Sequence, residues 1–216
     1  MHIAEGILSA PVLMAGAAAG AAGVGIGLHR LDDRSLVKVA VLSSAFFVAS
    51  LIKVPLGPVS VHLILNGLTG LLLGWAVFPA VAVALLLQAL LFGFGGLTTL
   101  GVNTVIMGLP GLASYYLFHR IAARSQGPVA FMAGFMAGAF AIALGGLLLA
   151  ATLMSTGEAF WNIAGVALGA HVPIMLVEGC VTGSAVVFLN KVRPGTLCAN
   201  VAPPILEAQP GAEPAA

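Results

Sequence analysis

Residues 128–154 read PVAFMAGFMAGAFAIALGGLLLAATLM and contain no charged side chain. A helix of about 20 mostly apolar residues crosses the hydrocarbon core of a bilayer, so this stretch predicts a membrane-spanning helix. The rest of the chain has the same character, because 60% of its 216 residues are hydrophobic and 7% are charged, with a mean hydropathy of +1.12. Soluble domains carry about 25% charged residues. The composition therefore excludes a free soluble enzyme, a disordered chain and a nucleic-acid binder that works through a basic patch.

Six further apolar stretches predict membrane spans on the same grounds: Ile7–Leu28, Leu36–Ile52, Val61–Trp75, Val77–Phe92, Leu100–Phe118 and Ile163–Leu189. The third and fourth of these stretches are short and meet at Gly74–Pro79, so they can also be read as a hairpin. We predict an all-α membrane protein, a bundle of about seven transmembrane helices in a single transmembrane domain over residues 1–193. The Pro- and Ala-rich residues 194–216 are predicted to be a flexible cytoplasmic tail.

The basic residues indicate how the bundle is oriented, because cytoplasmic loops of membrane proteins are enriched in Lys and Arg. With the N-terminus outside, seven of the eight basic residues would lie on the cytoplasmic side and only Lys53 outside. His29 and His119 would then anchor the cytoplasmic border beside arginines. No Lys or Arg precedes the first apolar stretch, so the basic region of a signal peptide is missing and we expect this stretch to be retained. The N-terminus is predicted to fold into the outer face, and the C-terminus to be cytoplasmic.

A histidine at position 2 predicts a metal chelate at the start of the chain. The α-amine of Met1, the amide nitrogen of His2 and the imidazole of His2 can close fused rings around one divalent metal in a plane, and His62 is the best candidate for the fourth position. Planar nitrogen donors suit Ni(II) or Cu(II) and can hold low-spin Co(II), but they do not suit Mg²⁺ or Ca²⁺. The alternative reading is an exposed terminal His2 and a hydrogen-bonded, structural His62.

Four other polar residues are candidates to support or gate this site. Glu5 would cap the first helix, where a negative charge is favourable. Asn103 ends a glycine-rich loop that lacks the Gly-Lys-Ser/Thr ending of a phosphate-binding loop, and we expect this loop to fold over the outer mouth. His171 and Glu178 share one helix face at a spacing of seven residues. An ionisable residue within a span suggests function, although the two would equally form a hydrogen-bonded pair that locks helices.

Glycines four residues apart allow helix backbones to approach closely in lipid. This spacing predicts tight packing inside the bundle, or a smooth face of the first helix that slides against a partner subunit. The pairs are Gly16 and Gly20, Gly23 and Gly27, Gly70 and Gly74, and Gly134 and Gly138.

Four motifs together resemble the CbiM/NikM family, the substrate-capture components of energy-coupling-factor transporters for cobalt or nickel, and its bacterial cobalt members most. They are MHIAEG at Met1–Gly6, SVHLILNG at Ser60–Gly67, GGLTTLGVN at Gly95–Asn103 and HVPIMLVEG at His171–Gly179. The resemblance runs from Met1 to about Arg193. One departure is that many relatives have a histidine in the loop where this chain has Phe94, which cannot bind a metal.

The resemblance implies a seven-helix protein that holds its metal through Met1, His2 and His62. It implies capture of Co²⁺ for cobalamin biosynthesis, with Ni²⁺ as the alternative, and a place in the bacterial cytoplasmic (inner) membrane. It also implies a CbiQ-type transmembrane coupling subunit, a pair of CbiO-type ATPases and, in some systems, a small CbiN-type membrane protein.

The motifs that are missing from the chain favour a transport subunit over an enzyme. We find no ATP-binding motif, no HExxH motif and no nucleophile system, so energy for uptake would come from a separate ATPase. A self-sufficient secondary permease is the more distant alternative, and it predicts inverted repeats and midplane charges. An intramembrane metalloenzyme would need an open metal position beside a general base. We expect no resident cofactor, only a transported metal.

Overall fold

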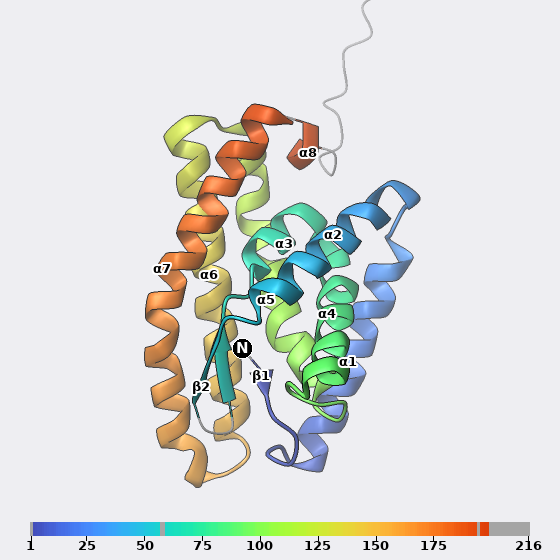
Figure 1. The fold of residues 1–216 in the computed structure, drawn as a ribbon, viewed down its shortest axis with the longest axis vertical. Coiled ribbons are helices and arrows are strands. Elements are labelled where there is room, and N and C mark those ends of the chain that lie inside the picture. Colours follow the sequence, from blue (N-terminus) through green and yellow to red (C-terminus); the bar gives the residue numbers. More distant parts are fainter. Residues whose placement is uncertain (1, 57–58, 194, 199–216) are drawn as a thin grey trace, which may run out of the picture.

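Seven helices of one bundle dominate the computed structural model, which describes residues 2–56, 59–193 and 195–198 (Figure 1). In chain order the helices are α1 Ala10–His29, α2 Asp33–Ala49, α3 Asn66–Leu73, α4 Val77–Phe92, α5 Leu100–Arg124, α6 Gly127–Met154 and α7 Trp161–Val192, followed by the short α8 Gly195–Cys198. Two 3₁₀ turns, η1 Gly74–Ala76 and η2 Glu158–Phe160, precede α4 and α7. The predicted all-α membrane bundle is confirmed.

Four helical stretches have the length and hydropathy of membrane spans: Ala10–His29, Asn66–Phe92, Gly127–Met154 and Glu158–Val192. The helix α2 is apolar but shorter. The helix α3 has only 8 residues, so it reaches across about 12 Å at 1.5 Å per residue and cannot cross a bilayer alone.

The chain reverses direction between α3 and α4, as the hairpin reading predicted. Asn66, at the start of α3, donates a hydrogen bond to the carbonyl of Met107 in α5, and Gly74 after the end of α3 lies against Tyr115. The helix α3 is therefore parallel to α5. Phe78 at the start of α4 packs against Gly108, and α4 then runs back along α5 (Figure 1).

A small antiparallel sheet, which we did not predict, precedes α3. Its strands are β1 His2–Ile3, β2 Lys53–Leu56 and β3 Val59–His62, in the order β1-β3-β2. The predicted third span therefore begins too early: Val61 lies in a strand, and the helix starts at Asn66. The sheet lies in the lower half of the bundle in Figure 1, at the end where α6 finishes and α7 begins.

The glycine face of α1 packs inside the bundle. A Cβ atom on Gly20 would lie 2.8 Å from the carbonyl oxygen of Gly101 in α5, and one on Gly23 would lie 2.5 Å from the ring of Phe78 in α4. Only a residue without a side chain allows these approaches. Tight internal packing is therefore the role of these glycines, and this face of α1 is not available to a partner subunit.

The described basic residues of the loops and helix ends gather at the end of the bundle opposite the sheet. They lie at the end of α1, the start of α2 and the ends of α5 and α7: Arg30, Lys38, Arg120, Arg124, Lys191 and Arg193. His119 differs from its predicted role as an interfacial anchor, because it is buried and stacks on Tyr115 with ring centroids 4.5 Å apart. Of the predicted tail, residues 195–198 form α8 with Leu197 buried; the remainder lies outside the described residues.

Candidate metal site

The first strand, β1, is held on both of its edges. On one edge it pairs with β3, with His2 opposite Ser60 and Ile3 opposite Val59. On the other edge the side-chain amide of Asn103 accepts a hydrogen bond from the Ile3 amide at 2.9 Å and donates one to the Ile3 carbonyl at 3.1 Å. Asn103 thus replaces a neighbouring strand. This clamp fixes the start of the chain within the bundle.

The clamp brings His2 and His62 together, as the sequence predicted. The Nδ1 atom of His2 lies 3.2 Å from the Nε2 atom of His62, and both side chains are buried, with exposures of 4% and 1%. Two nitrogens bound to one metal at about 2.0 Å and at right angles are about 2.8 Å apart. The pair is therefore close to the spacing of two adjacent ligands in a planar site.

The partners of the two outer ring nitrogens favour this use. His62 Nδ1 lies 2.8 Å from the Leu63 carbonyl oxygen, which can only accept, so Nδ1 carries the proton and Nε2 has the lone pair. His2 Nε2 lies 2.9 Å from Ser60 Oγ; when Nε2 donates to this hydroxyl, Nδ1 also has a lone pair. Metal-binding histidines are usually oriented in this way by an acceptor at the other nitrogen.

Burial also keeps the imidazole of His62 neutral. Loss of hydration lowers the pKa of His62 well below its usual value of 6.5, because burial disfavours the charged form. A neutral imidazole is the form that binds metal. The site is therefore deprotonated at His62 near neutral pH without help from a metal.

The carboxylate of Glu178 positions the segment that follows His62. It accepts hydrogen bonds from the backbone amides of Ile64 and Leu65, and its side chain has no exposed surface. Leu65 has a φ of 57°, so the chain turns sharply here before α3 begins at Asn66. A negative charge is favourable at a helix N-terminus. Glu178 therefore joins α7 to the turn that carries His62.

His171 lies buried in the same helix but is not the partner of Glu178. Its Nδ1 atom bonds to the carbonyl of Ala167, one turn earlier, and its ring lies against Gly146 of α6. The predicted hydrogen-bonded pair of His171 and Glu178 is therefore wrong. The carboxylate instead binds the two backbone amides near His62.

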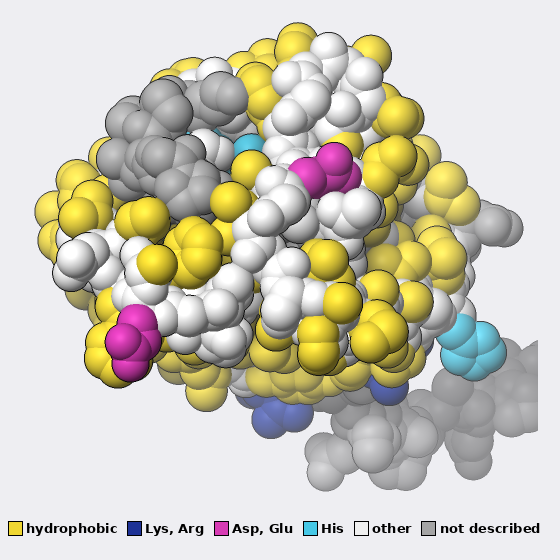
Figure 2. Space-filling model, turned by 90° about the horizontal axis from the view of Figure 1, so that it is seen from below, with side chains coloured by type: hydrophobic (Ala, Val, Ile, Leu, Met, Phe, Trp, Pro, Cys, Tyr) yellow, Lys and Arg dark blue, Asp and Glu magenta, His cyan; other side chains and the backbone are white. Residues whose placement is uncertain are grey.

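Glu5 holds the glycine-rich loop rather than capping α1, which begins five residues later. Its backbone amide donates to the carbonyl of Gly95 at 3.0 Å, and its carboxylate accepts from the Thr98 amide at 2.9 Å. These bonds from Thr98 lower the pKa of Glu5 below its usual 4.5. These contacts hold the glycine-rich loop against the start of the chain. Seen from this end, the surface is mainly hydrophobic or uncharged, with scattered Asp or Glu side chains and with Lys and Arg only at the distant margin (Figure 2).

Among the described His, Cys, Asp and Glu side chains, His2 and His62 are the two candidate donors at this site. Within the described ranges, no three His, Cys, Asp or Glu side chains are grouped so that they could hold a metal ion. Met1, the predicted amine ligand, lies outside the described residues. His2 and His62 are thus the part of the predicted ligand set that the structure brings together.

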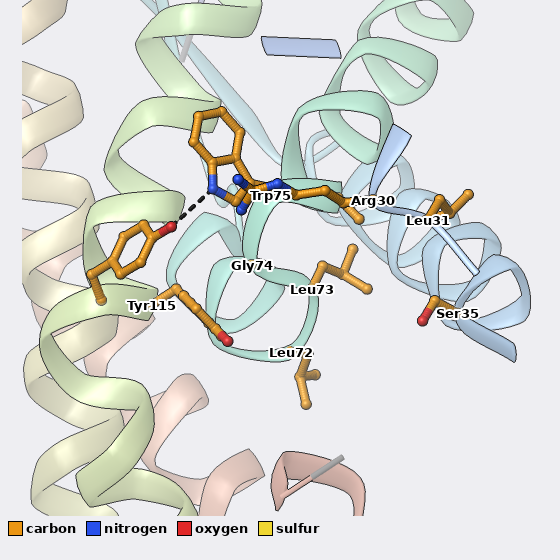
Figure 3. A pocket seen from close by; sticks show the side chains of 10 residues that line it. Arg30, Leu31, Ser35, Leu72, Leu73, Gly74, Trp75 and Tyr115 are labelled. Carbon is orange, nitrogen blue, oxygen red and sulfur yellow. Dashed lines mark hydrogen bonds between the residues drawn. The ribbon is translucent and has the colours of Figure 1, made fainter. Parts of the chain in front are cut away.

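A cavity at the opposite end does not offer metal ligands. It has a volume of about 300 Å³ and lies between the α1–α2 turn, the α3–α4 turn and α5 (Figure 3). Arg30 lies over the ring of Trp75 at 5.1 Å, and the indole donates to Tyr116 at 2.9 Å. The cavity lining holds no His, Cys, Asp or Glu. With Arg30 in its lining and no such ligand, this cavity does not favour a cation, and the histidine pair remains the candidate site.

Sequence reasoning missed two partners of the site, the hydroxyl of Ser60 and the carbonyl of Leu63. The contact of Ser60 with His2 depends on the sheet, which brings distant parts of the chain together, whereas Leu63 directly follows His62. The alternating valines of Val59-Ser-Val-His62 were the available signal for the strand, since alternating Val is typical of a strand.

A helical membrane bundle with a buried pair of histidines beside the chain start defines a class, the multi-pass membrane proteins that bind a metal ion. Within that class the chain belongs to the CbiM family. The family model described as "Cobalt uptake substrate-specific transmembrane region" matches residues 2–196. The resemblance drawn from the four motifs is confirmed.

Individual relatives agree with this assignment. A Haemophilus influenzae protein named for metal transport is 41% identical over 90% of this chain and 95% of its own length. The cobalt transport protein CbiM of Sorangium cellulosum is 35% identical, over 91% and 94%. A fused protein of Archaeoglobus fulgidus named for nickel transport is 29% identical, over 94% and 70%. A solved structure of a transition metal transporter matches with a TM-score of 0.75 and 25% identity, over 89% of this chain and 93% of that one.

The chain is therefore a substrate-specific membrane component of cobalt or nickel transport. A transporter component of this family is consistent with the predicted absence of enzyme activity.

Proposed function

We propose that this chain captures a divalent cobalt ion at the outer end of the bundle, in a planar set of four nitrogens. These are the Met1 amine, the His2 amide, His2 Nδ1 and His62 Nε2. The observation that carries the proposal is the 3.2 Å approach of His2 Nδ1 and His62 Nε2, with the hydroxyl of Ser60 beside the other nitrogen of His2 and the carbonyl of Leu63 beside that of His62. Nickel is the alternative cargo, because the same donors suit both ions.

The capture subunit would work within an ATP-driven importer of the bacterial inner membrane that supplies cobalamin biosynthesis. A CbiQ-type coupling subunit, a CbiO-type ATPase pair and a CbiN-type accessory protein are the proposed partners. Energy would come from these ATPases, since the sequence has no ATP-binding motif. Transport by this chain alone at the full rate, with the partner ATPase inactivated, would favour a secondary permease instead.

The substitution His2→Gln tests the chelate directly. It removes the imidazole nitrogen that closes the second ring around the ion, while the large side chain at position 2 leaves Met1 and its amine in place. We expect tight Co²⁺ and Ni²⁺ binding to be lost in the purified protein while the bundle stays folded in detergent. The same substitution at His29 is the control. Unchanged metal content in the N-terminal variant would contradict the proposed chelate.

A further inference from the structure

A row of four aromatic rings ends on the imidazole of His2. Phe47 of α2 lies beside Phe92 at the end of α4, with ring centroids 5.7 Å apart, and Phe92 stacks on Phe94 at 5.4 Å. Phe94 in turn stacks on His2, with centroids 6.1 Å apart and an angle of 19° between the ring planes. These separations lie within the range of favourable displaced stacking. The row connects two helix ends to the proposed ligand.

The backbone of the glycine-rich loop holds the ring of Phe94 against His2. Gly93 and Gly95 flank Phe94 with φ values of 63° and 75°, a conformation that favours glycine. A Cβ atom on Gly95 would lie 3.7 Å from the His2 ring, and the Gly95 carbonyl is held by the Glu5 amide. Phe94 is therefore placed on the imidazole by a loop that is itself fastened to the N-terminal segment.

The face of His2 that Phe94 covers matters for the metal. In a chelate closed by the amine, amide and imidazole of one chain start, the imidazole lies in the plane of the donors. A ring nearly parallel to the imidazole, with centroids 6.1 Å apart, therefore lies displaced over one side of that plane, the side from which a fifth ligand could approach. The residues Gly93–Gly96 bring only a phenyl group and backbone to this side.

We propose that Phe94 is a positioning and specificity residue of the metal site. It holds the His2 imidazole in the donor plane and excludes water or another axial ligand, which favours ions that accept four planar nitrogens over ions that need five or six ligands. This inference rests on the proposed chelate at His2 and adds a determinant that lies outside the four donors.

Three variants of the purified, full-length protein in detergent test the proposal, with Ni²⁺ as the probe. In Phe94→Leu the stacking is lost, and we expect release of Ni²⁺ to a chelator to be about 2- to 12-fold faster, as loss of one aromatic pair predicts. Phe94→Tyr keeps the ring and should release at nearly the wild-type rate. Phe94→His offers an axial nitrogen and should change the electronic spectrum from that of planar, low-spin Ni(II) to that of a high-spin ion. The control is Phe140→Leu, which removes a ring paired with Phe118 at another place in the bundle.

The outcomes separate the two proposals. If wild-type protein binds neither Co²⁺ nor Ni²⁺ with nitrogen donors, both the proposed function and this inference are overturned. If wild-type protein binds the ion, but Phe94→Leu releases it at the wild-type rate and Phe94→His keeps the planar spectrum, only the role of Phe94 is overturned. Equal acceleration in Phe94→Leu and Phe140→Leu would also overturn it, since a general loss of packing would then explain the effect.

Discussion

His62 differs from His171 in what its ring nitrogens face, although both are buried histidines of the same region. His62 turns Nε2 toward His2, whereas His171 bonds to a carbonyl of its own helix. We expect His62→Ala to weaken Co²⁺ binding more than about 100-fold, because it removes a donor, and His171→Ala to weaken it by about 10- to 100-fold at most, as for residues that only support ligands. Equilibrium dialysis of the two variants measures both values. Equal losses would mean that the fourth ligand has been misassigned.

The pKa of His62 predicts how the apoprotein responds to acid. Burial holds this pKa below its value of about 6.5 in the unfolded chain. Below that pH the unfolded state binds a proton that the folded state does not, so the free energy of unfolding falls as the pH decreases through about 6.5. Unfolding of metal-free protein in detergent at pH 5–8 should show this decline. The variant His62→Gln should show less of it, and an identical decline would assign it to other groups.

A residue of the site could be predicted from the sequence when its role depends only on its position in the chain and not on the fold. A histidine at position 2 is a chelating group in any fold, which is why His2 was found from its position. The role of Glu5 was not predictable, because its partner Thr98 is distant in sequence and the first helix begins later than its apolar stretch suggested. Phe94 was recognised only as a residue that cannot bind metal, since stacking on His2 depends on the fold of the loop.

At the scale of elements, Asn103 ties the strand β1 to the helix α5. Asn103→Ala removes both bonds to the backbone of Ile3, and unpaired buried groups cost about 1–3 kcal/mol each. We expect lower stability together with weaker metal binding and faster removal of N-terminal residues by an aminopeptidase.

Asn190→Ala is the matched control for this prediction. Like Asn103, Asn190 makes two side-chain hydrogen bonds to the backbone. It donates both, to the carbonyls of Ala122 and Ser125, at the opposite end of the bundle. This variant should lose stability and keep its metal affinity. If both asparagine variants reduced metal affinity equally, the clamp on β1 would have no specific role.

The helices were predictable as elements and the strands were not. Val77–Phe92 was predicted to the residue; Gly93 directly follows its apolar run, and Gly74 lies three residues before it. A strand of two residues such as β1 has no periodicity to detect, and its partner β3 lies far along the chain. The predicted span at Val61–Trp75 joined a strand to a short helix, since an apolar run of this length does not distinguish the two.

For the whole molecule, the separation of the histidine pair from the basic residues predicts the orientation in the membrane. The positive end should face the cytoplasm, so His2 and His62 should face outward. Gln126 and Ser155 are exposed and flank the same helix, α6, the first just before its start and the second just after its end. After Cys180 and Cys198 are replaced by serine, each position can carry a single cysteine.

In intact cells, we expect Ser155→Cys to react with a maleimide that does not cross membranes, and Gln126→Cys to react only after the membrane is opened. The two sites share one helix and differ in the end that they mark, so each is the control for the other. The reverse pattern would place the histidine pair on the cytoplasmic side, where it could not capture an incoming ion. Capture from outside therefore depends on this orientation, because the ion must reach the chelate before any ATPase acts.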